Sequence, residues 1–249
     1  MSLLSVDKLS KHFGALRAVD GISLDMEPGE LRAIIGPNGA GKTTFFNMIT
    51  GFFPPTTGTI TFAGQDITGL PVAARVACGM ARTFQITEIF PELTVRENIR
   101  IGVESAKGFR LRMFLRRAEA AGIAARIAEV LGLVGLDAKA ERRVGELSHG
   151  DQRAAEIGMA LTLEPRILLL DEPTVGMGEQ ETYDIARLIR RLHREQGYTV
   201  LLIEHDMRVV FNLADRISVL EQGRLLADGT PVEIAANPAV QAAYLGSVE

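Results

Sequence analysis

The sequence predicts an α/β protein with a mostly parallel central sheet, an antiparallel β layer at the N-terminus and an inserted helical sub-domain. Apolar runs at 31–35, 167–170 and 199–203 have the length and composition of buried strands, and each precedes a helical pattern. This alternation is typical of a parallel sheet covered by helices. From about 86 to 146 the sequence changes character and contains a stretch rich in helix formers, which we interpret as the sub-domain.

Length and composition favour a single domain over residues 1–249. With 249 residues and 47% apolar content, the chain can bury a proper core. We expect that core to consist of 1–85 and about 147–249, with the sub-domain inserted at about 86–146. The net charge of −4 gives no overall electrostatic argument for nucleic-acid binding.

Hydropathy and cysteine content indicate where the protein works. The first residues lack the basic start and long apolar core of a signal peptide, and no apolar run approaches the about 18 residues of a membrane span. The single cysteine fits a reducing compartment. We therefore expect a cytoplasmic protein that reaches a membrane only through a partner.

Two short alternating runs, 4–6 and 21–25, predict the N-terminal antiparallel layer. The turn residues Pro28 and Gly29 separate this layer from the first buried strand. Phe13 lies within the layer. An exposed aromatic ring at this position is able to stack on a base, whereas the pattern alone favours an ordinary core phenylalanine.

A glycine-rich loop at 36–44 follows the first buried strand and leads into a helix at 43–49. Its letters match G-x-x-x-x-G-K-[ST], the phosphate-binding loop. Glycines let backbone N–H groups turn toward phosphate oxygens, and the helix N-terminus adds partial positive charge. The residues that we expect to contact the nucleotide are Gly36, Pro37, Asn38, Gly39, Ala40, Gly41, Lys42, Thr43 and Thr44.

Two side chains of this loop have distinct expected roles. Lys42 is placed to reach the outer phosphates during catalysis, and the Thr43 hydroxyl is placed to bind the Mg²⁺ that accompanies them. A nucleoside triphosphate is therefore the expected ligand. Which nucleotide it is, and what becomes of it, has to be inferred from the rest of the chain.

Gln85 ends a strand-like segment at 81–85. At the carboxyl edge of a central strand, its amide would face the crevice where α/β sheets bind ligands. There it would contact both Mg²⁺ and the attacking water. Gln85 is therefore a candidate for both catalysis and metal binding.

The segment 147–150, which reads Leu-Ser-His-Gly, precedes a helix at 152–163. Ser148 is a plausible N-cap, and with Gly150 it leaves backbone N–H groups and the helix dipole pointing outward. A capped helix start is the simplest interpretation. Because the phosphate loop is already one anion site, this second site also suggests that Ser148 and Gly150 grip a nucleotide held by another subunit.

Carboxylates and a histidine follow two of the buried strands. Asp171 and Glu172 end the run at 167–170, and His205 comes shortly after the run at 199–203. At the carboxyl ends of parallel strands, Asp171 can hold Mg²⁺ through water, and Glu172 can orient and deprotonate the attacking water. His205 is then suited to hydrogen bonding with a γ-phosphate, although an isolated histidine is more often a packing residue.

Taken in order, these motifs resemble those of the nucleotide-binding subunits of ATP-binding cassette (ABC) transporters over essentially the whole chain. The sequence has the phosphate loop, the glutamine loop, an LSGGQ-like signature at 147–152, the acidic strand end and the switch histidine. Five further stretches are similar to the LivG-like ATPases of branched-chain amino acid importers. They are 13–21, 81–85, 90–95, 203–207 and 243–246.

The resemblance implies a P-loop NTPase core that binds ATP, with Phe13 against the adenine, and that couples ATP hydrolysis to transport. The partners it implies are a second ATPase subunit, identical or different, integral membrane permease subunits and, indirectly, a periplasmic or extracellular solute-binding protein. No nucleic acid is expected. The implied location is peripheral, on the cytoplasmic face of the inner (plasma) membrane.

The sequence departs from the family pattern at two places. His149 and Asp151 stand where the family more often has glycine and glutamine, and the segment 174–178 lacks the usual aspartate near Gly178.

Relatives that handle urea, other amides or lipopolysaccharide share much of the pattern, so transport of these solutes is an alternative function. A soluble ABC ATPase acting on nucleic acid would need a coiled-coil insertion or a second cassette. A P-loop kinase or GTPase would leave 148–152 and His205 unexplained.

Overall fold

The computed structural model describes residues 2–83, 89–106 and 117–245. The strands are β1 Leu4–Phe13, β2 Leu16–Met26, β3 Leu31–Ile35, β4 Thr57–Phe62, β5 Gln65–Asp66, β6 Met80–Thr83, β7 Ile167–Asp171, β8 Thr199–Ile203, β9 Arg216–Glu221 and β10 Arg224–Gly229. The α-helices are α1 Lys42–Thr50, α2 Val72–Ala77, α3 Val95–Ala106, α4 Arg117–Val134, α5 His149–Leu161, α6 Glu179–Arg194, α7 Met207–Leu213, α8 Pro231–Ala235 and α9 Pro238–Leu245. Short 3₁₀ helices lie at Asp137–Lys139 and Val144–Glu146.

The central sheet has the strand order β10-β9-β3-β8-β7-β6. All its neighbouring pairs are parallel except β9 and β10, which form an antiparallel hairpin through the turn at 222–223. Strands β3, β7 and β8 are buried at every position, as the apolar runs predict. Their carboxyl ends therefore meet at one edge of the sheet.

A second, antiparallel sheet has the order β2-β1-β4-β5. Its first two strands are longer than the alternating runs suggest, and register shifts interrupt their pairing. These irregularities break the strict alternation of apolar and polar residues on which the sequence pattern depends. The predicted fold class, with a mostly parallel sheet, an antiparallel N-terminal layer and added helices, is confirmed.

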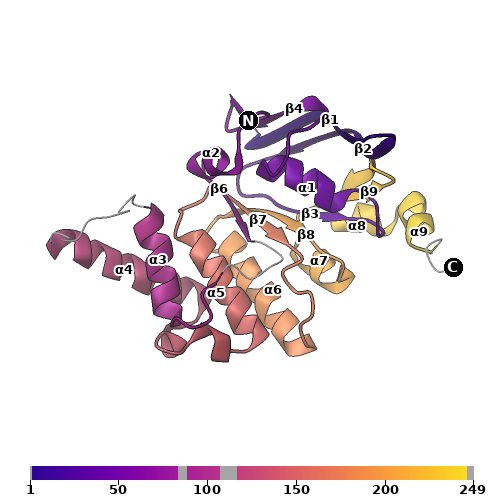
Figure 1. Cartoon of the computed structure of the whole chain (residues 1–249). Helices are drawn as coiled ribbons and strands as arrows, with labels where there is room; N and C mark the ends of the chain where they lie inside the picture. The colour runs from indigo at the N-terminus through magenta and orange to yellow at the C-terminus, as the bar shows by residue number, and fades with distance from the viewer. Residues whose placement is uncertain (1, 84–88, 107–116, 246–249) are drawn as a thin grey trace.

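Side-chain alternation along the central strands divides the core into two clusters. On β7, Ile167 and Leu169 face a cluster shared with α1 and the antiparallel sheet. Leu168 and Leu170 face the opposite cluster, which they share with α5, α6 and α7. The central sheet is thus covered on both faces, and Figure 1 shows α1 between the two sheets.

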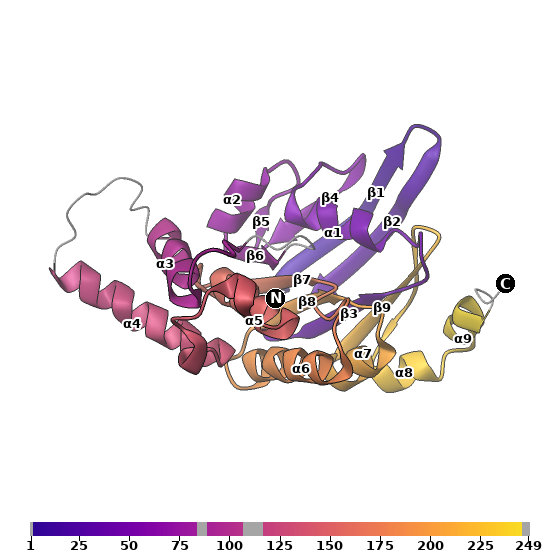
Figure 2. The same ribbon diagram turned by 60° about the horizontal axis from the view of Figure 1, so that its bottom comes forward.

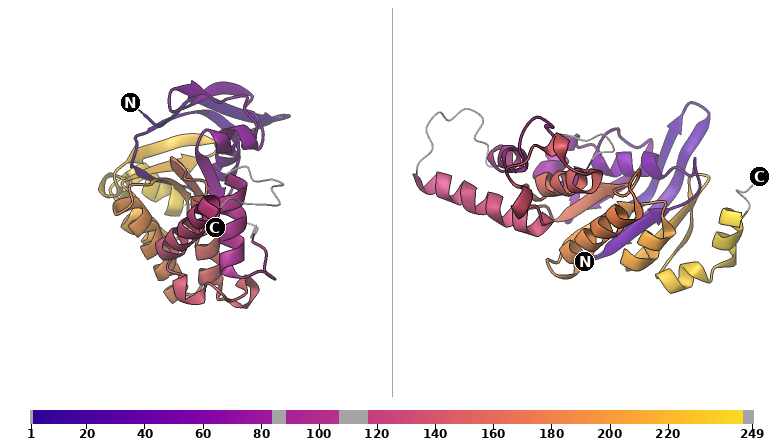
Figure 3. Two further views of the ribbon diagram at one scale, coloured as in Figure 1. Left: turned by 90° about the vertical axis from the view of Figure 1, so that its left-hand side faces the viewer. Right: turned by 90° about the horizontal axis from the view of Figure 1, so that it is seen from below.

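The helices between β6 and β7 extend the molecule at one end. Figures 2 and 3 show α3 and α4 on that side, whereas α8 and α9 lie at the opposite end. Buried Val103 on α3, Val130 on α4 and Leu161 on α5 belong to one apolar cluster with the central sheet. None of the helices in the described ranges combines the length and hydropathy that a membrane span needs.

A buried arginine closes the C-terminal end of α1, and the sequence patterns give no sign of it. Arg75 on α2 is 1% exposed. Its Nη1 donates to the carbonyls of Met48 and Ile49, both at 2.6 Å, while Nε and Nη2 donate to those of Leu70 and Thr68. Burial lowers the pKa of Arg75 to about 10, so the group stays charged at neutral pH. Arg75 thereby adds donors to the carbonyls at the C-terminal end of α1, where the Met48 carbonyl also accepts from the Gly51 N–H at 3.2 Å.

Replacement of this guanidinium should destabilise the fold. We expect Arg75→Ala to lower the free energy of unfolding by about 3 kcal/mol or more, because several buried carbonyls lose their donor. Arg75→Lys should recover only part of this loss, since a single ammonium lacks the planar fork. Urea unfolding followed by circular dichroism measures the effect. Arg100→Ala on the exposed face of α3 is the control, and equal losses in the two alanine variants would contradict the assignment.

Candidate functional site

The phosphate loop runs between β3 and α1, and its backbone is packed tightly against neighbouring segments. A Cβ on Gly36 would lie 2.1 Å from the Leu220 carbonyl oxygen, and one on Gly41 would lie 2.4 Å from that of Ala18. Both glycines also have positive φ, 150° and 95° respectively. Side chains are therefore excluded at these two positions by contact as well as by backbone conformation.

The C-terminal hairpin supports the loop from behind. The Gly223 N–H, in the turn between β9 and β10, donates to the Ala40 carbonyl at 3.0 Å. Tyr244 on α9 also reaches this region. Burial raises the pKa of Tyr244 to about 12, and the nearby backbone N–H of Gly36 acts in the opposite direction. Segments far apart in sequence thus fix the start and the middle of the loop.

Lys42 is folded back onto its own loop. The side chain is 5% exposed, and its Nζ donates to the carbonyls of Gly36 at 2.7 Å and Pro37 at 3.0 Å. Burial lowers the pKa of Lys42, and the nearby carboxylate of Glu172 opposes that shift. Thr43 is exposed at the start of α1. The loop therefore presents a hydroxyl at its mouth and holds an ammonium group against its carbonyls.

Asp171 ends β7 and is 1% exposed. Its Oδ2 accepts from Arg82 Nη2 at 2.9 Å, and its carbonyl accepts from Arg153 Nη2 at 2.8 Å. Burial raises the pKa of Asp171, while Arg82 and Arg153 oppose the rise. Both arginines were missed from the sequence, although Arg82 sits as a lone charge in a short apolar strand.

Glu172 and His205, on loops after β7 and β8, are brought together. His205 Nε2 lies 2.7 Å from Glu172 Oε1. Glu172 has a left-handed backbone with φ of 46°, which is costly for a residue with a Cβ. The His205 side chain is 44% exposed, so it is not a packing residue. An acid and an imidazole in contact at an open strand edge have the geometry that proton transfer needs.

A third carboxylate holds these two loops in place, and the sequence analysis overlooked it. Glu204 is 3% exposed. Its Oε1 accepts from the N–H and the hydroxyl of Thr174 at 2.9 and 2.5 Å, and its Oε2 accepts from the His205 N–H at 2.9 Å. The sequence signal for Glu204 is a charged residue directly after an apolar strand, which is the same pattern that identifies Asp171 and Glu172.

The ring of Phe13 is available for contact. Phe13 is 49% exposed at the end of β1, so the core interpretation is wrong. Its ring lies edge-on to that of Phe53 at 5.7 Å, and Lys11 Nζ lies 5.4 Å from the Phe13 centroid. This geometry leaves an aromatic surface open to a base. Stacking on adenine stays a prediction.

Ser148 caps α5, as expected, by accepting from the Asp151 N–H at 3.2 Å. Gly150 donates its N–H to Glu181 Oε1 on α6 at 3.2 Å. Among the residues that the structure describes, no hydrogen bond or ion pair joins Ser148 or Gly150 to the phosphate loop. The two predicted anion sites are therefore separate within one chain. Gln85 lies outside the described residues.

The donor set of this site fits a magnesium ion. Asp171 Oδ1 is buried and has no hydrogen-bond partner among the described residues, so one carboxylate oxygen is free for a ligand. Thr43 offers a hydroxyl at the mouth of the loop. Such hard oxygen ligands suit Mg²⁺, which is usually held by one or two protein oxygens together with substrate phosphates. Consistently, no cluster of three or more His, Cys, Asp or Glu side chains forms a self-contained metal site in the described ranges.

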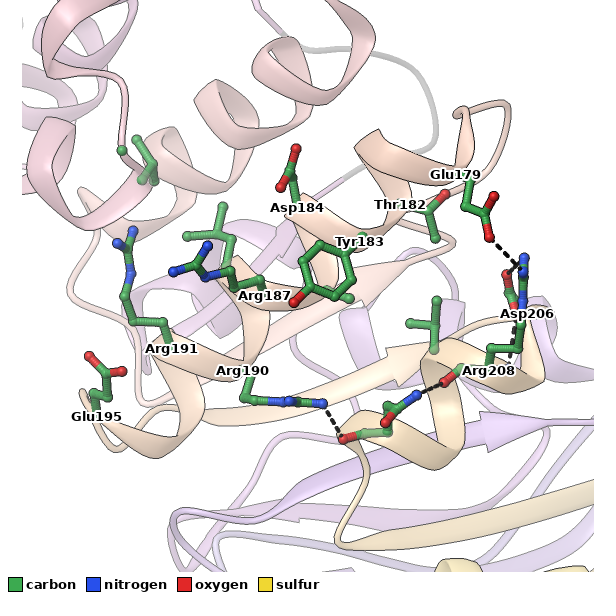
Figure 4. Close-up of a pocket in the computed structure, with 16 residues that line it drawn as sticks. Glu179, Thr182, Tyr183, Asp184, Arg187, Arg190, Arg191, Glu195, Asp206 and Arg208 are labelled. Carbon is green, nitrogen blue, oxygen red and sulfur yellow. Dashed lines mark hydrogen bonds and ion pairs between the residues drawn. The ribbon is translucent and has the colours of Figure 1, made fainter.

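One surface groove lies away from this chemistry. Figure 4 shows a groove of about 890 Å³ along α6 and α7, with Tyr183, Arg187, Arg190 and Arg208 among its lining residues. None of the predicted nucleotide-contacting residues lines it. Glu172 and His205 instead line a smaller hollow of about 300 Å³. Strand-end chemistry, not hollow size, therefore identifies the candidate site.

Comparison with known proteins supports a nucleotide site. Residues 19–175 match a family described as "ABC transporter", and residues 224–249 match one described as "Branched-chain amino acid ATP-binding cassette transporter". The chain is 43% identical to the high-affinity branched-chain amino acid transport ATP-binding protein LivG of Escherichia coli (strain K12), over 98% of both chains.

Two solved structures extend the comparison. The ADP conformation of MJ1267, an ATP-binding cassette of an ABC transporter, has a TM-score of 0.87 and 32% identity, covering 99% of this chain and 100% of that chain. The dimeric post-hydrolysis state of the ATP-binding cassette MJ0796, bound to ADP and Pi, has a TM-score of 0.75 and 25% identity. The superposition with MJ0796 covers 92% of this chain and 98% of the MJ0796 chain.

The packing of Gly36 gives a prediction for nucleotide binding. Gly36→Ala should weaken nucleotide binding at least about tenfold, because the new methyl group would force the loop away from the Leu220 carbonyl. Titration with a fluorescent ATP analogue measures the affinity. Gly64→Ala is the matched control: Gly64 also has positive φ, at 81°, but a Cβ there meets nothing within 4 Å. Equal affinity in the two variants would show that the contact is unimportant.

Proposed function

We propose an import role for this chain, which belongs to the ABC transporter family of ATP-binding proteins. As a member of that family it binds and hydrolyses ATP to power transport. The solutes that we propose are branched-chain amino acids. The name of the E. coli relative and the family matched by residues 224–249 both support this choice.

The contact between Glu172 and His205 carries the catalytic proposal. Glu172 takes the proton of the attacking water. His205 contacts that carboxylate before ATP enters and donates to the γ-phosphate once ATP is bound. The buried Glu204 keeps both loops at this spacing. Lys42 exchanges its loop carbonyls for the outer phosphate oxygens when ATP enters, and Phe13 stacks on the adenine.

Asp171, Thr43 and Gln85 are the residues that would hold Mg²⁺. When bound, Mg²⁺ neutralises charge on the phosphates and favours departure of the leaving group. Arg82 and Arg153 stabilise the ionised form of Asp171, because both oppose the rise in its pKa that burial causes. This explains why two arginines surround one carboxylate at the end of β7.

We propose a head-to-tail dimer as the working unit. Each ATP lies between the phosphate loop of one subunit and the α5 N-terminus of the other, where Ser148 and Gly150 contact the γ-phosphate. The separation of the two anion sites within one chain supports this arrangement, since neither is joined to the other by contacts among the described residues. The dimeric structure of MJ0796 with ADP and Pi is a precedent within the same fold.

The dimer acts on membrane permease subunits from the cytoplasmic face of the membrane, where it is peripheral. A solute-binding protein delivers the amino acid on the other side. Closure on ATP and opening after hydrolysis move the permease through the segment at 86–146 and the stretch after Gln85. This is a population shift set by the affinity of ATP for the closed dimer.

Loss of the Glu172 carboxylate should strongly slow ATP hydrolysis without weakening ATP binding. We expect Glu172→Gln to lower kcat for ATP hydrolysis by about 10²–10⁴-fold, because the amide cannot accept the water proton. ATP affinity should remain close to that of the parent. Phosphate release and nucleotide titration measure the two quantities. Glu179→Gln, an exposed carboxylate change on α6, is the control, and undiminished hydrolysis in Glu172→Gln would defeat the assignment.

Solute identity is tested with the intact transporter. The chain, purified with its permease subunits and solute-binding protein and placed in vesicles, should take up radiolabelled leucine when ATP is supplied on its own side. Lys42→Ala should abolish that uptake, because it removes the cation that holds the outer phosphates. Uptake of urea or an amide without uptake of leucine would replace the proposed substrate class.

A further inference from the structure

The N-terminus of α5 already holds an anion from its own subunit. The Glu181 carboxylate on α6 accepts from the Gly150 N–H at 3.2 Å. Its second oxygen accepts from the Gly178 N–H at 3.3 Å. Ser148 Oγ accepts from the Asp151 N–H at 3.2 Å, within the same turn. Of the two groups assigned to the γ-phosphate of a neighbouring ATP, the Gly150 N–H is therefore already engaged by a carboxylate of its own subunit.

The local geometry favours this engagement. A Cβ on Gly150 would lie 3.3 Å from the Glu181 Cβ, so the two helix starts are in close contact. The partial positive charges of the α5 and α6 N-termini converge on the carboxylate. The backbone N–H groups of Gly150 and Gly178 lower the pKa of Glu181, which keeps it ionised at neutral pH.

We propose that Glu181 is a built-in competitor for the γ-phosphate at the α5 N-terminus. The proposal rests on the dimer described above and concerns the regulation of that same site. Glu181 is a positioning residue: it does not touch the reacting atoms, but it controls whether the Gly150 N–H is free to contact the γ-phosphate.

Competition follows from charge and from the number of donors. One N–H cannot serve a carboxylate and a phosphate at full strength, and two anions at the same place repel each other. Lys139, a cation near the α5 N-terminus, does not neutralise this repulsion, because its Nζ is paired with Asp151 Oδ2 at 2.5 Å. ATP therefore has to displace Glu181 before the dimer closes, and this sets the ATP concentration at which closure begins.

Displacement also reaches the segment at 174–178. The same carboxylate accepts from the Gly150 and Gly178 N–H groups, so its displacement from α5 alters a contact that the starts of α5 and α6 share. That segment begins with Thr174, which is held by Glu204 beside His205. Arrival of a phosphate on one subunit's α5 is thereby linked to the catalytic loops of that same subunit.

The test uses full-length protein in a Glu172→Gln background, so that ATP is not consumed. Sedimentation velocity gives the ATP concentration at half-maximal dimer formation. Adding Glu181→Gln should lower that concentration about tenfold, the factor expected when one charge-assisted hydrogen bond no longer has to be broken. Glu179→Gln removes the same charge from the same helix end and should leave the concentration unchanged. Its side chain is 89% exposed.

A second readout separates competition from a structural role. Binding of a fluorescent ATP analogue to the monomer should be equal in all these variants, because Glu181 does not contact the phosphate loop. Glu181→Asp keeps the charge but is one methylene shorter and cannot bridge both N–H groups. It should lower the ATP requirement by a smaller factor, and it carries the test if the glutamine variant does not fold.

The outcomes are distinguishable from failure of the dimer itself. Ser148→Ala in the same background should raise the ATP requirement. If it does, while Glu181→Gln leaves the requirement equal or higher, the competition is disproved and the dimer stands. If Ser148→Ala has no effect on ATP-driven dimer formation, the shared nucleotide site and the competition both fall.

Discussion

The functional site depends on one constraint, which is that the buried strands β3, β8 and β7 lie side by side and parallel. Their apolar faces fix them in the core, so their carboxyl ends are forced to one edge. The phosphate loop follows from β3, Asp171 and Glu172 lie at the end of β7, and His205 follows from β8. Register within the sheet therefore sets the distances on which catalysis depends.

Buried charge then fixes the loops that the strands place. Glu204 joins the segments after β7 and β8 through four donors, and Arg82 with Arg153 holds Asp171 from β6 and α5. A buried carboxylate without such partners would be costly. Because the contacts of Glu204 with Thr174, and of Asp171 with Arg82 and Arg153, join different elements, the site and the packing of the sheet cannot be altered independently.

The sequence was sufficient for the strands, the phosphate loop and the acids, because each is a local pattern of a few residues. It was insufficient for Arg75, Glu204 and Glu181, whose roles come from contacts with residues distant in the chain. Phe13 shows another limit of sequence patterns. The alternation of apolar residues favoured a buried side chain, but Phe13 lies at the end of β1 and is exposed. Periodicity reports which face is apolar, and it does not report where a strand stops.

The support given to the phosphate loop by the C-terminal hairpin has a practical consequence. The Leu220 carbonyl and the Gly223 turn brace the loop, and Tyr244 on α9 reaches Gly36. A purification tag or fluorescent domain fused beyond α9 would thus be attached to the scaffold of the nucleotide cradle. Labels intended to be silent are better placed in the turn after β4, where Gly64 has open space around it.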